Sequence, residues 1–127
     1  MTDRRETEQL LRGMYAARLR GDLAGVCDAF SLDARFRISG PSNASLLAMS
    51  AHGIDQLRPL LAIMIKSFKL NDLEILSLLI DGAKAAVHWR VNIFSRLTGE
   101  TVVTELIDVI AVHDGRIASF TELFAPA

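Results

Sequence analysis

Two carboxylates and a histidine in the second half of the chain have the side-chain types that proton transfer requires. Asp108 lies in the strongly apolar segment LIDVIAV, where a carboxylate has to be paired, hydrated or protonated to avoid a large desolvation cost. A histidine gains or loses its charge close to neutral pH, so His88 also suits proton transfer. Glu122 is either an acid in a pocket or a charged group that reaches solvent at a strand end. These three residues are the expected catalytic groups of an enzyme, or a salt-linked cluster in a protein without activity.

Two further side chains suit ligand binding. The planar guanidinium of Arg90 can clamp a carboxylate or phosphate, and it could equally hold Glu122 in place. Tyr15 could donate a hydrogen bond to a ligand carbonyl, although an aromatic residue at helical spacing usually packs in the core. The sequence leaves both roles of each residue open.

Residues that bind metals or cofactors do not occur at usable spacing. His52 precedes a predicted helix and His113 lies in a predicted turn, and no histidines and carboxylates are spaced as metal ligands. The sequence also lacks a phosphate-binding glycine loop, a nucleophile elbow and a C-x-x-C motif. The single cysteine, Cys27, falls in an apolar helical pattern and is predicted to be a small buried thiol. We therefore predict no metal, no cofactor and no cysteine chemistry.

The composition limits the classes of partner. The chain has 127 residues, with 14 lysines and arginines against 15 aspartates and glutamates, so its formal net charge is −1. Without a basic excess to hold a polyanion by counterion release, we expect no nucleic acid partner. The N-terminal segment has no apolar signal region, and no stretch approaches the roughly eighteen apolar residues that span a bilayer. We expect one domain over residues 1–127, no membrane partner and a cytoplasmic location.

Helical spacing of apolar residues predicts three helices that would carry part of the pocket. Asp3 and Glu6 have the spacing of a capping box, and Asp22 can cap a short second helix. The expected helices cover about 3–20, a short segment in which Leu23, Val26, Cys27 and Phe30 share one face, and a segment from Gly53 to Phe68.

Alternating apolar and polar residues predict one early strand and four later ones. The early strand is ARFRI at 34–38, and the turn formers SGPSNAS at 39–45 after it would form the rim of a pocket. The later strands are LEILSLLI, AAVHWRVNIF, TVVTELIDVIAV and RIASFTELF, and glycine turns separate them. Helices followed by an antiparallel meander predict an α+β fold in which the helices cover one face of a curved sheet.

Strand register decides which side chains meet, because a slip of one residue sends every side chain to the other face. Gly99 and Gly115 suit three-residue loops that end in a left-handed bulge residue. Even-numbered residues of the last three strands would then share the pocket face. The predicted rows are His88, Asp108 and Phe120, then Arg90, Leu106 and Glu122, then Asn92, Thr104 and Phe124.

The opposite, odd-numbered face is apolar enough to be core or a subunit interface. Its members are Val87, Trp89, Val91, Ile93, Val103, Ile107 and Val109. A two-residue turn in place of either loop would flip the parity across that hairpin, and Trp89 would then face Asp108.

Several short segments share their order and spacing with a known group of proteins. They are R-G-D-L at 20–23, D-A-R-F at 33–36, H-G-I-D-Q-L at 52–57, and the closing I-D-V followed by D-G-R-I. Over nearly its whole length the chain resembles SnoaL-like polyketide cyclases and ketosteroid isomerases of the nuclear transport factor 2-like superfamily. The resemblance implies a conical α+β barrel with a ligand pocket between helices and sheet.

The resemblance to ketosteroid isomerases also implies roles for single residues. Those enzymes use a general-base aspartate on the first strand, an oxyanion-binding tyrosine and a protonated aspartate. The base position falls on Ile38, the tyrosine position on Met14 with Tyr15 beside it, and the aspartate on Asp108. Isoleucine accepts no proton, so proton abstraction by that base is not expected here.

Limonene epoxide hydrolase is similar in a different set of residues. It has an Arg-x-Asp on a middle strand and an acidic residue on the last strand, and those positions hold Arg90, Asn92 and Glu122 here. An asparagine cannot serve as the acid or base of a water-activating pair, so hydrolysis by that triad is not expected.

Three functions therefore remain open. The first is an isomerase, cyclase or hydrolase that acts by acid–base chemistry on an apolar, oxygen-bearing ligand. The second is a non-catalytic module that binds a small apolar or carboxylate-bearing molecule, and the third is a dimerisation module; we expect a homodimer. The expected ligand contacts are Arg90, Asn92, Tyr15, Phe120, Leu106, Ile38 and Met14.

Overall fold

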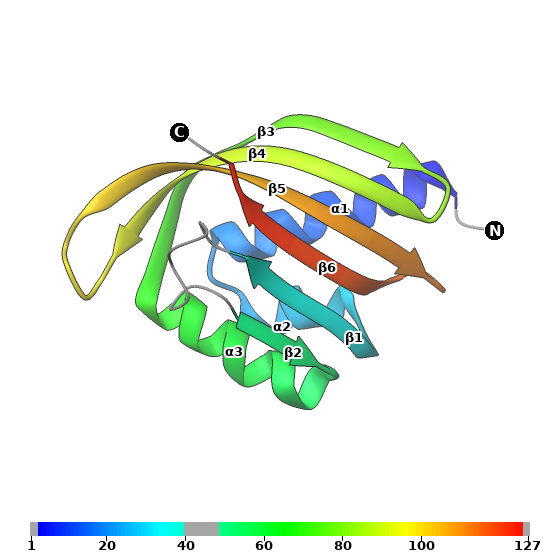
Figure 1. Cartoon of the computed structure of the whole chain (residues 1–127), viewed down its shortest axis with the longest axis horizontal. Coiled ribbons are helices and arrows are strands. Elements are labelled where there is room, and N and C mark those ends of the chain that lie inside the picture. Colours follow the sequence, from blue (N-terminus) through cyan, green and yellow to red (C-terminus); the bar gives the residue numbers. More distant parts are fainter. Residues whose placement is uncertain (1–2, 40–48, 126–127) are drawn as a thin grey trace.

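The structure, a computed structural model, describes residues 3–39 and 49–125 and arranges them as helices packed against one curved sheet (Figure 1). Its helices are α1 (Arg4–Leu19), α2 (Leu23–Asp28) and α3 (Ile54–Ser67). Its strands are β1 (Phe30–Ser39), β2 (Met49–His52), β3 (Phe68–Asp81), β4 (Lys84–Ser95), β5 (Thr101–His113) and β6 (Arg116–Phe124).

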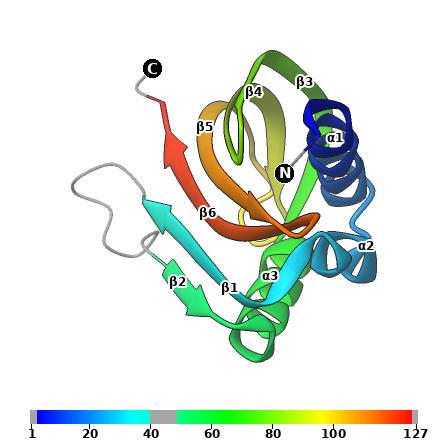
Figure 2. The ribbon, with the colours of Figure 1, turned by 90° about the vertical axis from the view of Figure 1, so that its right-hand side faces the viewer.

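The sheet has six strands in the order β2-β1-β6-β5-β4-β3. The pair of β1 and β6 is parallel, and every other neighbouring pair is antiparallel. Figure 2 shows the sheet curving around the helices without closing on itself. The predicted α+β class and the meander of four later strands are therefore confirmed.

The helices begin where the sequence predicts. The Asp3 side chain accepts a hydrogen bond from the backbone N–H of Arg5 at 3.0 Å, and Asp22 accepts one from Gly25 at 3.0 Å. Gly53 precedes α3 with a positive φ of 84°, which glycine adopts without steric cost. Helix α1 buries one face, made of Thr7, Leu11, Met14, Tyr15 and Ala17, at the spacing of an amphipathic helix.

Some elements differ from the sequence prediction in extent. Phe30, predicted on the second helix, is the first residue of β1, where its ring packs 6.1 Å from Phe36 and 5.8 Å from Phe120. Strand β2 was not predicted, and β3 begins directly after α3 at Phe68. The predicted rim loop at 39–45 falls outside the described residues except for Ser39, which ends β1.

The predicted register between β4 and β5 is wrong. The N–H of Ser95 donates to the carbonyl of Glu100 at 2.9 Å, so the loop holds four residues, 96–99, with Gly99 at φ 76°. Because of the fourth loop residue, odd-numbered residues of β4 share a face with even-numbered residues of β5. Val87 consequently pairs with Asp108, and Trp89 pairs with Leu106.

The hairpin of β5 and β6 also differs from its prediction, yet even-numbered residues of β5 still share a face with even-numbered residues of β6, as predicted for the pocket side. His113 pairs with Arg116 around a two-residue turn in which Asp114 and Gly115 both have positive φ, at 51° and 75°. A bulge between Ala111 and Val112 then shifts the register by one residue. The two one-residue changes add up to a shift of two residues, which preserves the parity, and Asp108 lies directly opposite Glu122 instead of Phe120.

The corrected register decides which residues face the helices. The predicted odd-numbered apolar face divides between the two sides: Val87, Trp89 and Val91 are buried inside, whereas Val103, Ile107 and Val109 are exposed on the outer face. The interior face of the sheet consists mainly of Ala34, Phe36, Ile38, Val87, Trp89, Val91, Leu106, Asp108, Ile110, Val112, Ile117, Phe120 and Glu122. Asp108 and Glu122 are thus carboxyl groups within an otherwise apolar surface.

Candidate functional site

A cavity of about 510 Å³ lies between the helices and the interior face of the sheet. Ligand pockets of small-molecule proteins have volumes of about 300–1,000 Å³ and apolar walls with a few polar groups. Its apolar lining consists of Leu19, Val26, Ile38, Met49, Leu61, Met64, Ile65, Phe68, Leu70, Trp89, Ile93, Leu106 and Phe124. The polar lining is confined to charged side chains, so the cavity suits a largely apolar molecule with few polar atoms.

Two hydrogen-bonded pairs form a buried polar network beside this cavity. The Tyr15 hydroxyl donates to Oδ2 of Asp108. The Arg18 guanidinium donates to Glu122 twice, from Nη1 to Oε2 at 2.6 Å and from Nη2 to Oε1 at 3.4 Å. Because Asp108 and Glu122 are direct partners across β5 and β6, the two pairs are adjacent. Helix α1 thus supplies two donors, one helical turn apart, to two neighbouring carboxyl groups.

Burial and a like charge change the protonation of Asp108. Its side chain is 0% exposed, and this burial, followed by the nearby charge of Glu122, raises its pKa well above the ordinary value. Arg18 and the Tyr15 hydroxyl oppose the rise without cancelling it. Asp108 is therefore a carboxylic acid in the folded protein over a pH range in which exposed aspartates are ionised, and an acid can donate a hydrogen bond.

The pKa values of Tyr15 and Arg18, which bond the two carboxyl groups, are also shifted. Burial, with the charge of Asp108 next, raises the pKa of the Tyr15 hydroxyl, so it stays a donor. Burial, the largest single influence, lowers the pKa of Arg18, but the charge and hydrogen bonds of Glu122, together with Asp108 and Tyr15, outweigh it and raise that pKa. Arg18 therefore keeps its positive charge although it is largely removed from water.

Trp89 completes the packing of Arg18. The guanidinium carbon lies 5.0 Å from the centroid of the indole ring, and the Tyr15 ring lies 5.1 Å from the same indole at a tilt of 58°. A guanidinium over the face of an indole gains a cation–π attraction. Arg18 is thus held between a carboxylate and an aromatic face, which fixes where its remaining N–H groups lie.

Only part of this network reaches the cavity. Arg18, Trp89 and Glu122 line it, whereas Tyr15 and Asp108 do not and lie behind them. Glu122 is consequently the carboxylate that a ligand would meet. Asp108 and Tyr15 can act on that ligand only through Glu122.

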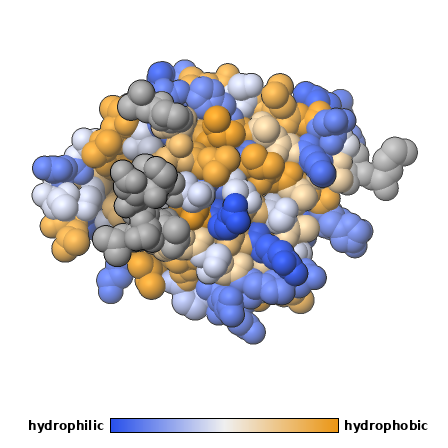
Figure 3. All heavy atoms as spheres, viewed as in Figure 1, coloured by the Kyte–Doolittle hydropathy of each residue, from blue (hydrophilic) through white to orange (hydrophobic). Residues whose placement is uncertain are grey.

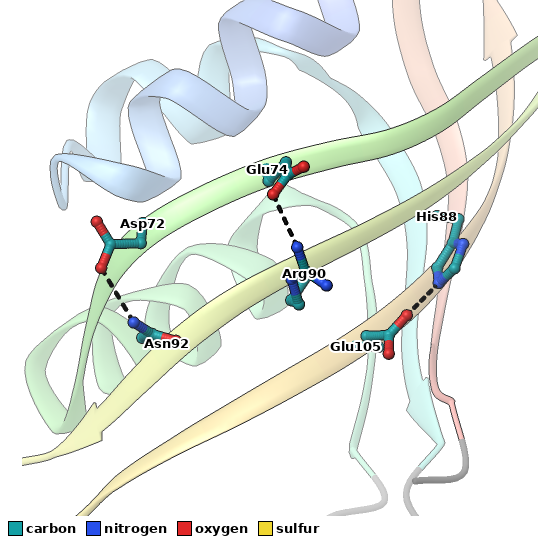
Figure 4. Close-up of polar contacts among 6 residues, drawn as sticks. All are labelled: Asp72, Glu74, His88, Arg90, Asn92 and Glu105. Carbon is teal, nitrogen blue, oxygen red and sulfur yellow. Dashed lines mark hydrogen bonds and ion pairs between the residues drawn. The ribbon is translucent and has the colours of Figure 1, made fainter.

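Three predicted site residues lie elsewhere. His88, Arg90 and Asn92 project from the outer face of the sheet, where each bonds an exposed acidic residue (Figure 4). The contacts are His88 Nε2 to Glu105 Oε1 at 2.7 Å, Arg90 Nη2 to Glu74 Oε2 at 2.9 Å, and Asn92 Nδ2 to Asp72 Oδ2 at 3.0 Å. The prediction that they share a face with Asp108 is wrong, because the four-residue loop reverses the facing of β4 relative to β5.

The other predicted residues are on the interior side. Ile38 and Leu106 line the cavity, while Met14 and Phe120 are buried in the core next to it. Sequence reasoning did not identify Arg18 or Trp89 as site residues. The signal for Arg18 was its position one turn after Met14 and Tyr15 on the apolar stripe of α1, where a cation requires a buried partner.

Within residues 3–39 and 49–125, no group of three or more histidines, cysteines, aspartates or glutamates could hold a metal ion. Cys27 is buried as predicted, and burial raises the pKa of its thiol. No helix in the described part of the chain has the length and apolar character to cross a membrane.

Comparison with known proteins agrees with this architecture. Residues 11–120 match the family model of the SnoaL-like domain. The chain belongs to the SnoaL-like family. A comparison with curated protein sequences found no match. The SnoaL-like chain is similar in structure to proteins with the nuclear transport factor 2-like fold, which confirms the conical α+β fold.

Three solved structures illustrate the similarity. A candidate isomerase from Bacillus subtilis superposes with a TM-score of 0.85 at 17% identity, over 99% of this chain and 91% of that one. A nuclear transport factor 2-like protein from Burkholderia xenovorans gives 0.80 at 21% identity, over 98% and 93%. An epoxide hydrolase of the limonene type from M. tuberculosis gives 0.74 at 19% identity, over 94% and 83%. At these identities the likeness concerns the fold.

Proposed function

We propose that this SnoaL-like protein is a cofactor-independent acid–base enzyme in which Glu122 accepts a proton inside the cavity. The substrate is a small, largely apolar molecule that carries oxygen, and the proton comes from a carbon next to its carbonyl or from a water molecule beside it. The observation that carries the proposal is that Glu122, 2% exposed, is the single carboxylate in the lining of a cavity whose other lining residues are mostly apolar and otherwise cationic. A positioned base in a site that excludes water can contribute about 10²–10⁴ to a rate.

Arg18 has two functions in this proposal. It balances the charge of Glu122 through two hydrogen bonds, and these use two of its five N–H groups. Because Arg18 also lines the cavity, a remaining N–H group can stabilise negative charge that develops on a substrate oxygen.

Asp108 and Tyr15 are positioning residues. Asp108, neutral through its raised pKa, lies opposite Glu122 and can donate a hydrogen bond to it, so two adjacent buried negative charges are avoided. Tyr15 holds Asp108 from the other side. This arrangement supplies a base from β6, although Ile38 occupies the position of the isomerase base on β1.

Deuterium exchange tests the proposal whatever the final product of the reaction is. The protein is incubated in D₂O with a panel of apolar ketones, and loss of the protons next to the carbonyl is followed by proton NMR. We expect Glu122→Gln to slow enzyme-dependent exchange at least about 100-fold. Glu105→Gln makes the same chemical change on the exposed outer face and should leave the rate unchanged. Equal exchange in wild type and Glu122→Gln would refute a base at this position.

Loss of folding could imitate loss of the base, because Glu122→Gln leaves the Arg18 cation buried without its partner. The double variant Arg18→Met/Glu122→Gln removes both charges and restores a neutral site. It should fold and still lack exchange. A second panel of apolar epoxides in ¹⁸O-labelled water tests proton abstraction from water, with label incorporation read by mass spectrometry.

Non-catalytic binding is the second candidate function. The absence of a proton acceptor at Ile38, which lines the cavity, favours it. Under this alternative the cavity binds a small apolar or carboxylate-bearing molecule and catalyses no exchange. Ligands that raise the melting temperature of the wild-type protein without any exchange or label incorporation would support binding alone.

A homodimer through the outer face of the sheet accompanies either proposal. Leu79, Ala86, Val109 and Thr121 form one row across β3 to β6, and Leu79 and Val109 are 65% and 49% exposed. Figure 3 shows apolar side chains among polar ones over the strands in view. Light scattering should report a dimer that Val109→Lys breaks and that Leu97→Lys, in the exposed β4–β5 loop, leaves intact. A monomeric wild type contradicts the idea.

A further inference from the structure

The cavity has a buried end at which two charged side chains meet. Arg18 and Glu122 line the cavity, and their side chains are only 11% and 3% exposed. Trp89, which is fully buried, lies beside them, with its ring 5.0 Å from the Arg18 guanidinium. The remaining charged residues of the described lining are exposed, namely Arg20, Lys69 and Arg96. A polar group that a ligand carries to the inner end, defined here as Arg18, Trp89 and Glu122, therefore meets Arg18 and Glu122.

Both members of this pair keep hydrogen-bonding capacity for a ligand. The two contacts with Glu122 use two of the five N–H groups of Arg18. A carboxylate has about four lone-pair sites, of which Arg18 fills two and a bond from Asp108 can fill a third. The contact from Nη2 of Arg18 to Oε1 of Glu122 is long, at 3.4 Å, so Oε1 is the less strongly bound oxygen. The inner end thus offers a donor and an acceptor side by side.

The inner end carries no net charge. The opposite charges of Arg18 and Glu122 lie within 2.6 Å of each other. Asp108, opposite Glu122 on the neighbouring strand, is neutral because burial and the charge of Glu122 raise its pKa. A charged ligand group would add an uncompensated charge in a place removed from water, which is costly. An uncharged head group avoids this cost.

The closeness of donor and acceptor limits the head group further. Because Arg18 and Glu122 bond each other, one small group has to reach both. A primary carboxamide does so, since its carbonyl oxygen accepts and its N–H donates from atoms on the same carbon. A ketone, an ester or a tertiary amide accepts from Arg18 and brings no donor to Glu122. A primary amide also has the shape of a methyl ketone, with N–H in place of the C–H next to the carbonyl.

We propose that the inner end is a binding site for an uncharged carboxamide head group, whose carbonyl oxygen accepts from Arg18 and whose N–H donates to Glu122, while an apolar body lies along the cavity walls. The inference rests on the proposed function in that the same two side chains act in both. Where a ketone would present its acidic C–H to Glu122, the amide presents an N–H that stays in place. Simple alkyl amides are therefore expected to be tight, unreactive ligands.

Binding of four alkyl compounds tests the proposal independently of catalysis. Calorimetric titrations at pH 7 use octanamide, its isosteric ketone 2-nonanone, N,N-dimethyloctanamide and octanoate. We expect octanamide to bind about tenfold more tightly than 2-nonanone, because it adds one hydrogen bond to a charged acceptor. N,N-dimethyloctanamide has no N–H and should lose this advantage. Octanoate should bind at least about tenfold more weakly than octanamide, because it places a second negative charge beside Glu122.

Matched variants locate the effect. Arg18→Met/Glu122→Leu replaces the pair with apolar side chains, which a buried site tolerates, and should bind 2-nonanone more tightly than octanamide. Glu105→Gln, on the outer face, should bind all four compounds as the wild type does. Equal affinity of the wild type for octanamide and 2-nonanone, tighter binding of octanoate than of octanamide, or no binding of any compound would overturn the inference. So would an undiminished preference for octanamide in the double variant, and the wild-type series decides alone if that variant does not fold.

The two proposals fail separately. Exchange that depends on Glu122 without a preference for the amide would retain the acid–base function and reject the carboxamide site. A preference for the amide without exchange on any ketone would retain the carboxamide site and reject the enzyme.

Discussion

Replacement of Asp108 by asparagine should change how the stability of the protein depends on pH. The raised pKa means that the folded protein binds the Asp108 proton more tightly than the unfolded chain does. The stabilisation is fully present below the ordinary pKa of 3.8 and is lost as pH rises through the higher pKa of the folded state. Asparagine is neutral at every pH, so Asp108→Asn removes this dependence.

The size of the effect follows from linkage. One proton held only by the folded state changes the free energy of unfolding by about 1.4 kcal/mol per pH unit. Between pH 4 and the folded-state pKa, the wild type should therefore lose up to about 1.4 kcal/mol per pH unit relative to Asp108→Asn.

Urea unfolding at a series of pH values from about 4 to 8 measures this difference. Asp28→Asn serves as the matched control, because it makes the same chemical change at an exposed aspartate outside the buried network. Parallel stability curves for the wild type and Asp108→Asn would show that Asp108 is ionised in the folded protein. The account of a neutral acid behind Glu122 would then be wrong.

Three further substitutions test the buried network and the loop that sets the register of β4 and β5. Arg18→Met should cost about 3–5 kcal/mol in urea unfolding, because it leaves Glu122 buried without its cation, and Arg18→Met/Glu122→Gln should regain part of that loss; an equal or larger loss in the double variant would contradict this. Tyr15→Phe removes the donor to Asp108 and should cost about 1–3 kcal/mol, whereas a neutral result would mean that this hydrogen bond is not formed. Gly99→Ala forces alanine to a φ of 76° and should lower stability by about 1 kcal/mol in thermal unfolding, and no loss would argue against the left-handed conformation at this position.

The order and type of most elements could be predicted because their signals are local. Asp3, Asp22 and Gly53 mark helix starts through their own side chains or backbone, and the alternation in β4, β5 and β6 does not depend on distant residues. The short strand β2 carries too few residues for such a pattern. Its pairing with β1 depends on tertiary contact.

Which side chains lie in the site depends on differences of one residue in the length of the turns between the strands. Gly99 was correctly expected in the left-handed region, but the loop contains one residue more than predicted, and this moved His88 and Arg90 to the outer face. Asp108 and Glu122 were both predicted as site residues, and the structure makes them direct partners because the turn and the bulge together shift the register by two residues. Loop length and bulges are set by the packing of the whole sheet, so they could not be predicted from the sequence pattern alone.

The position of Trp89 gives the protein a natural optical reporter. It is the single tryptophan of the chain, it lines the cavity, and it lies against the Arg18 guanidinium and the Tyr15 ring. Indole emission responds to nearby charge and to water, so a molecule that enters the cavity should shift the emission wavelength or intensity. Occupancy of the site can therefore be followed by intrinsic fluorescence with no label attached.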